Sequence, residues 1–66
     1  MIAHSELVDL AVYRIRVAVG CARYVTLGKF ERSTGHLKGF FRTNDYGNIP
    51  LDDPEQGEVT VLERLE

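Results

Sequence analysis

The side chains that could pair a nucleophile with a histidine base in this chain are Ser5, Ser33, Cys21, His4 and His36. Nucleophilic catalysis needs a hydroxyl or thiol beside an activating base, inside a pocket. Their spacing matches no catalytic triad, and the two serines have structural roles as a helix cap and a turn residue. The single cysteine is expected to be a small buried apolar group. The sequence therefore predicts no enzyme, no catalytic residue and no small-molecule substrate.

The acidic stretch after Pro50 is the one place where a metal site can be tested. Asp52, Gly57 and Glu63 stand at the first, sixth and twelfth positions of a calcium-loop pattern. The third and fifth positions, where that pattern has further oxygen ligands, hold Pro54 and Gln56, and the flanking segments are typical of strands rather than helices. Two histidines and one cysteine also fall short of a zinc site. We expect no metal and no cofactor.

Charge is divided unevenly between the two parts of the chain. Residues 1–43 hold seven basic and three acidic side chains, whereas residues 44–66 hold one basic and seven acidic side chains. The first part therefore carries a net charge of +4 and the second a net charge of −6. Such asymmetry bears on the kind of partner that a protein binds.

The acidic part suggests the leading functional hypothesis. Carboxylates along a rigid edge can imitate the phosphates of a duplex and steer a protein into a basic groove. We therefore expect a non-enzymatic protein-interaction module, of the type of small phage inhibitors, that blocks a nucleic-acid-binding site on a partner protein with a basic groove. The residues expected to bind this partner are Asp45, Asp52, Asp53, Glu55 and Glu58. The alternative role for these carboxylates is a solvated loop that keeps the protein soluble.

The segment from residue 23 to residue 42 suggests the alternative function. Basic side chains alternate there with aromatic ones, and cations can neutralise phosphates while aromatic rings stack on bases. This pattern is consistent with a small single-stranded nucleic-acid-binding protein. Its expected binding residues are Arg32, Lys38, Phe40 and Arg42. The competing interpretation is that the aromatic residues form the core.

Length and composition limit the architecture. A chain of 66 residues forms one domain, 1–66, with a small core, so a partner or a second copy in a homodimer could add stability. No apolar run reaches the ~20 residues that a membrane-spanning helix needs, and we expect no membrane contact. A lone cysteine favours a reducing compartment, and the expected location is cytoplasmic.

The element expected to organise the chain is an amphipathic helix from Ser5 to Ala22. Apolar residues recur along it at helical spacing, and Gly20 or Gly28 is expected to end it. A strand is the alternative, because residues 12–19 alternate and are rich in β-branched side chains. Alternation fails upstream of residue 12, which favours the helix.

Three strands are expected to follow the helix. Residues 29–32 and 36–43 would form a hairpin around Ser33–Gly35, residues 49–51 could be at most an edge strand, and residues 58–65 would be the last strand. The predicted fold class is α+β, with the N-terminal helix packed on a three-stranded antiparallel sheet, and the alternative is an all-β meander. The expected core comprises Val8, Ala11, Ile15, Val19, Leu37, Phe41, Val59 and Val61.

Overall fold

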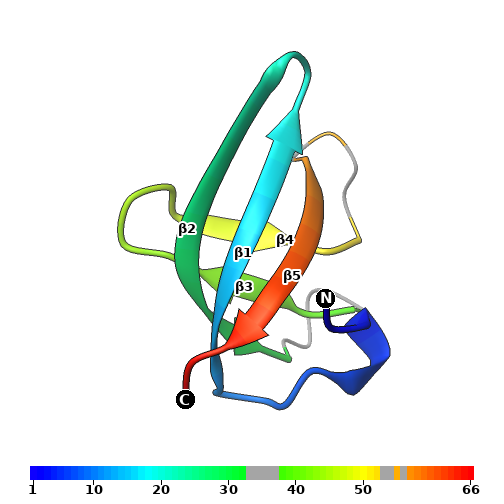
Figure 1. Ribbon diagram of the computed structural model, residues 1–66, viewed down its shortest axis with the longest axis vertical. Helices are drawn as coiled ribbons and strands as arrows, with labels where there is room; N and C mark the ends of the chain where they lie inside the picture. Colours follow the sequence, from blue (N-terminus) through cyan, green and yellow to red (C-terminus); the bar gives the residue numbers. More distant parts are fainter. Residues whose placement is uncertain (33–37, 53–54, 56) are drawn as a thin grey trace.

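Five β-strands and one short 3-10 helix make up the computed structural model, which describes residues 1–32, 38–52, 55 and 57–66 (Figure 1). The helix η1 spans His4–Glu6. The two long strands are β1, Val12–Val19, and β2, Ala22–Glu31. They are followed by β3, Phe40–Arg42, β4, Asn48–Pro50, and β5, Glu58–Arg64.

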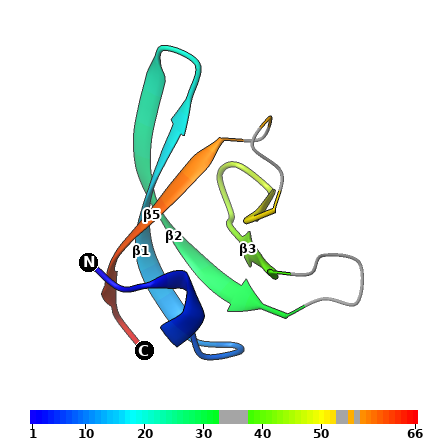
Figure 2. The same cartoon turned by 90° about the vertical axis from the view of Figure 1, so that its right-hand side faces the viewer.

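All five strands belong to one antiparallel sheet. Their order is β4-β3-β2-β1-β5, so β5 returns across the molecule to pair with β1. The sheet is strongly twisted: β3 and β4 run across the direction of the long β1–β2 hairpin, as Figures 1 and 2 show. This twist brings the inner face of the sheet around a single hydrophobic core.

The predicted N-terminal helix is wrong, and so is the α+β fold class. Gly20 has φ +58° and forms, with Cys21, a two-residue turn between Val19 and Ala22, which are paired across β1 and β2. A positive φ at such a turn matches the twist of the flanking strands and does not occur inside a helix. The break in alternation that favoured the helix lies before residue 12, in the segment that leads into β1. The all-β alternative is confirmed, although β5 joins β1 rather than β4.

Alternating side chains of the strands build the core. Most of its members point inward from β1, β2 and β5, with the aromatic rings of Tyr13, Phe30 and Phe41 in contact. The expected core residues Ala11, Ile15, Phe41, Val59 and Val61 are buried as predicted. Val8 and Val19 are 46% and 38% exposed, so they were wrongly assigned to the core, and Leu37 lies outside the described residues.

The last strand was located correctly from sequence, and the limit placed on residues 49–51 agrees with the edge position of β4. β4 is an edge strand that contains Pro50, and β5 falls within the predicted range 58–65. The N-terminal segment covers part of the outer edge of β5: Ile2 N donates to Val61 O at 2.9 Å, and His4 Nε2 lies 2.9 Å from Val59 O. Backbone groups at this edge that another chain could pair with are thereby occupied.

Candidate interaction surfaces

The outward side chains of β1 and β2 form the most distinctive surface, which we name the β1–β2 outer face. Along β1, buried Tyr13, Ile15 and Val17 alternate with exposed arginines, and β2 alternates in the same way. The register places Arg14 beside Leu27 and Arg16 beside Val25. The face comprises Arg14, Arg16, Arg23, Val25, Leu27 and Lys29.

This face combines an apolar centre with a basic rim. Val25 and Leu27 are 54% and 52% exposed, which is unusual for adjacent large aliphatic side chains on a small sheet. In the described part of the chain, no ion pair is formed by Arg16, Arg23 or Lys29. The apolar strip of Val25 and Leu27 is therefore bordered by three positive side chains that form no ion pair with the described residues.

The fold mixes the two oppositely charged parts of the sequence. Because β5 pairs with β1, Glu63 forms an ion pair with Arg14, and Glu58 borders a hollow of about 260 Å³ together with Arg16 and Arg23. The acidic C-terminal strand thus lies along one side of the β1–β2 outer face. The basic and acidic parts of the sequence therefore do not form two separate surfaces of opposite charge.

The five carboxylates expected to bind a basic groove are spread over the molecule. Asp45 lies in the turn between β3 and β4, whereas Asp52, Glu55 and Glu58 lie in the connection between β4 and β5 and at its end; Figure 1 shows these two regions at opposite ends of β4. Asp52 and Glu58 border one hollow of about 450 Å³, which His4 and Lys38 also line. Asp53 lies outside the described residues.

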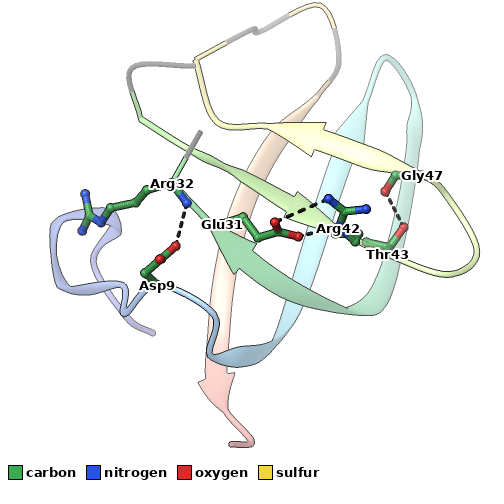
Figure 3. Close-up of polar contacts among 6 residues, drawn as sticks. All are labelled: Asp9, Glu31, Arg32, Arg42, Thr43 and Gly47. Carbon is green, nitrogen blue, oxygen red and sulfur yellow. Dashed lines mark hydrogen bonds and ion pairs between the residues drawn. The ribbon is translucent and has the colours of Figure 1, made fainter. Parts of the chain in front are cut away.

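The expected nucleic-acid-binding residues divide into two pairs. Phe40 is only 8% exposed, and the guanidinium carbon of Arg42 lies 5.9 Å from the centre of its ring. Arg42 is bonded to Glu31 (Figure 3), and this hydrogen bond, with the attraction between the two charges, raises the pKa of Arg42. Arg32 and Lys38 instead line a separate hollow. The four residues do not form one stacking surface.

A pair of tyrosines forms a surface feature that sequence reasoning missed. The rings of Tyr24 and Tyr46 are stacked with centroids 4.0 Å apart and an angle of 25° between their planes. Thr43 holds the turn that carries Tyr46, because its hydroxyl donates to Gly47 O at 2.8 Å (Figure 3) and accepts from Tyr46 N. Burial, and secondarily Tyr46, raises the pKa of Tyr24. No local pattern links residues 24 and 46.

Of the residues considered for catalysis, His4 and Ser5 line one hollow, and Cys21 lies in a different part of the fold. Cys21 is exposed in the β1–β2 turn, so its predicted burial is wrong. His4 bonds a backbone carbonyl, and Ser33 and His36 lie outside the described residues. Among residues 1–32, 38–52, 55 and 57–66, no group of three or more His, Cys, Asp and Glu side chains could hold a metal ion.

Within the part that the structure describes, no helix has the length and apolar character to cross a membrane. Searches of protein-family models, curated proteins and solved structures gave no match to this sequence.

Proposed function

We propose that the chain is a non-enzymatic protein-interaction module that docks through its β1–β2 outer face on an acidic surface of a partner protein. The observation that supports this proposal is the apolar strip of Val25 and Leu27 bordered by Arg16, Arg23 and Lys29. Protein interfaces combine a desolvated apolar centre with a charged rim, and complementary charge on the partner speeds encounter and fixes orientation. A cytoplasmic setting, in which the exposed Cys21 stays reduced, belongs to the same proposal.

Aromatic placement favours a protein partner over single-stranded nucleic acid. Sequence-tolerant binding of single strands depends on aromatic side chains whose faces are open to bases. Phe30, Phe40 and Phe41 are buried, and Tyr24 and Tyr46 stack on each other. The exposed apolar side chains of the outer face are aliphatic, and these pack against protein side chains.

The acidic version of the module is the second candidate. It is favoured by Asp52 and Glu58, which border the same hollow and project from one connection. Lys38 and His4 line that hollow as well, so a basic partner would meet mixed charge there. For this reason we place the outer face first.

A capture experiment with charge-reversed variants separates the two candidates. The unaltered chain, Arg16→Glu/Lys29→Glu and Asp52→Lys/Glu55→Lys are immobilised, incubated with host extract, and compared for the amount of each retained protein. We expect one dominant acidic protein whose retention falls about tenfold or more with the basic-face reversal and is little changed by the acidic-loop reversal. Arg16→Lys/Lys29→Arg is the matched control that keeps the charge.

Loss of capture with the acidic-loop reversal alone would instead support the second candidate and refute the first. Leu27→Ser tests the apolar strip, since docking requires its burial and purely electrostatic adsorption does not. Sedimentation at two protein concentrations tests for a homodimer, in which a second copy would supply the acidic surface. Circular dichroism of every variant shows whether the fold is retained.

A further inference from the structure

A separate cationic hollow lies beside the N-terminal segment, away from the proposed docking face. Its volume is about 310 Å³, and the described residues that line it are His4, Ser5, Arg32 and Lys38. Sites for small ligands start at about this size. Two permanent positive charges, an imidazole and a hydroxyl meet there, and no carboxylate is among the described lining residues.

Arg32 is held in place by three contacts. Its backbone N–H donates to Asp9 Oδ1 at 2.8 Å, and its Nη2 donates to Leu7 O at 3.1 Å. The guanidinium carbon lies 5.5 Å from the centre of the Phe30 ring. Figure 3 shows the guanidinium on the side of the N-terminal segment, apart from the Asp9 carboxylate. Positioning the guanidinium in advance lowers the entropic cost of binding an anion.

Lys38 and Ser5 supply the remaining donors, and His4 borders the hollow. No hydrogen bond or ion pair of the Lys38 side chain is formed with any other residue that the structure describes, so its ammonium is available to a ligand. His4 Nε2 donates to Val59 O at 2.9 Å, which fixes the ring; Nδ1 donates to an anion only when the imidazole is protonated. The Ser5 hydroxyl can donate as well.

Carboxylates near the hollow reduce its positive potential, but none is among the described residues that line it. Asp9 is bonded to the backbone of Arg32, and Asp52 and Glu58 border the neighbouring hollow, which shares His4 and Lys38. Glu6 follows Ser5 along the chain and is exposed. The two positive charges of Arg32 and Lys38 in the hollow therefore balance one group with two negative charges.

We propose that this hollow binds the phosphate of a small phosphomonoester. A phosphomonoester carries close to two negative charges at neutral pH and three acceptor oxygens. Arginine matches two of these oxygens at once, and lysine contributes a point charge to the third. The remaining volume is sufficient for only a small organic group on the phosphate. This inference is independent of docking on the outer face.

The test is a two-dimensional ¹H–¹⁵N NMR titration of the full chain with phenyl phosphate, at ionic strength held constant with sodium chloride. We expect saturable shifts centred on the amides of residues 4, 5, 32 and 38. Lys38→Ala should weaken binding about tenfold and Lys38→Arg should retain it, because the latter keeps the charge. Arg64→Ala removes an exposed charge from β5 and should leave the affinity unchanged.

Three results would overturn the proposal. The first is a set of shifts that does not saturate or that spreads over all basic residues, as expected for ion atmosphere alone. The second is equal affinity in Lys38→Ala. The third is tighter binding of oligothymidylate without a terminal phosphate, which would assign the hollow to a phosphodiester backbone.

Discussion

Replacing Gly20 and Gly57 separately by alanine distinguishes the observed sheet from the helix that the sequence favoured. Gly57 has φ +116°, and an added Cβ would lie 2.5 Å from Val19 Cγ2 and 2.8 Å from Val17 Cγ1. Gly20 has φ +58° with no atom within 4 Å of an added Cβ. Both positions therefore strain an alanine backbone, but only Gly57 adds a collision with β1.

The expected losses follow from these contacts. A left-handed backbone costs a residue with a Cβ about 1–2 kcal/mol, and overpacking a tight site costs a further ~1–3 kcal/mol. Gly57→Ala should thus lower the free energy of unfolding by about 2–5 kcal/mol, and Gly20→Ala by about 1–2 kcal/mol. A domain of this length has a total stability of roughly 3–10 kcal/mol, so Gly57→Ala takes a large part of it.

Urea denaturation measures both changes, and an unaltered dependence of the free energy on urea confirms that the unfolding transition is comparable. If the helix continued through Gly20 to Gly28, Gly20→Ala would instead stabilise the chain by roughly 1 kcal/mol, since alanine is the better helix former inside a helix. A stabilised Gly20→Ala, or a Gly57→Ala no worse than Gly20→Ala, would refute the reasoning.

Three further predictions concern other parts of the chain. Leu10 is 57% exposed and has φ +69°. Leu10→Gly should therefore be as stable as the unaltered chain or up to ~1 kcal/mol more stable, whereas Leu10→Ala keeps the backbone strain. A glycine variant less stable than the alanine variant in urea denaturation would contradict this. The pKa of Tyr24 is raised above 10.0, which means that the folded state favours the neutral phenol. The resulting contribution to folding stability is complete below pH 10.0 and is lost as the pH rises further. Tyr46→Phe should bring this pKa only part of the way back, as measured by phenolate absorbance, because burial is the larger cause. Cys21 should react with a thiol reagent in the folded protein, and Cys21→Ser should change stability by less than ~0.5 kcal/mol, whereas protection from the reagent would indicate burial.

Strand-forming residues could be recognised from sequence only where alternation extended to a turn signal. β5 was located because Val59 and Val61 share one side of an alternating segment after Gly57, whereas Pro50 only limited residues 49–51 to an edge position. β1 has equally clear alternation, but the apolar residues 7, 8, 10 and 11 before it also fit a helical period. In such a helix Tyr13 falls on the side opposite these apolar residues, whereas in β1 it is 1% exposed.

Contacts between distant residues decided what the sequence could not show. The ion pair of Arg14 and Glu63 forms only because β5 pairs with β1. The cationic hollow forms only because His4 lies near the end of β2. Arg32 and Lys38 were both selected from sequence as anion-binding residues, and they do share one hollow. Their partner His4 was considered from sequence only as a catalytic base, and no local pattern indicates its bond to Val59.

The most direct test of the central claim is a nuclear Overhauser experiment on the β1–β2 hairpin, since its register creates the outer face. Val19 and Ala22 close a two-residue turn, so Arg16–Val25 and Arg14–Leu27 are pairs without mutual hydrogen bonds, whose α-carbons approach to about 4.5 Å. We predict strong contacts between the α-protons of Arg16 and Val25 and between those of Arg14 and Leu27. Sequential amide–amide contacts along residues 5–22, with α-proton contacts to the amide three residues ahead, would indicate a helix and contradict the claim.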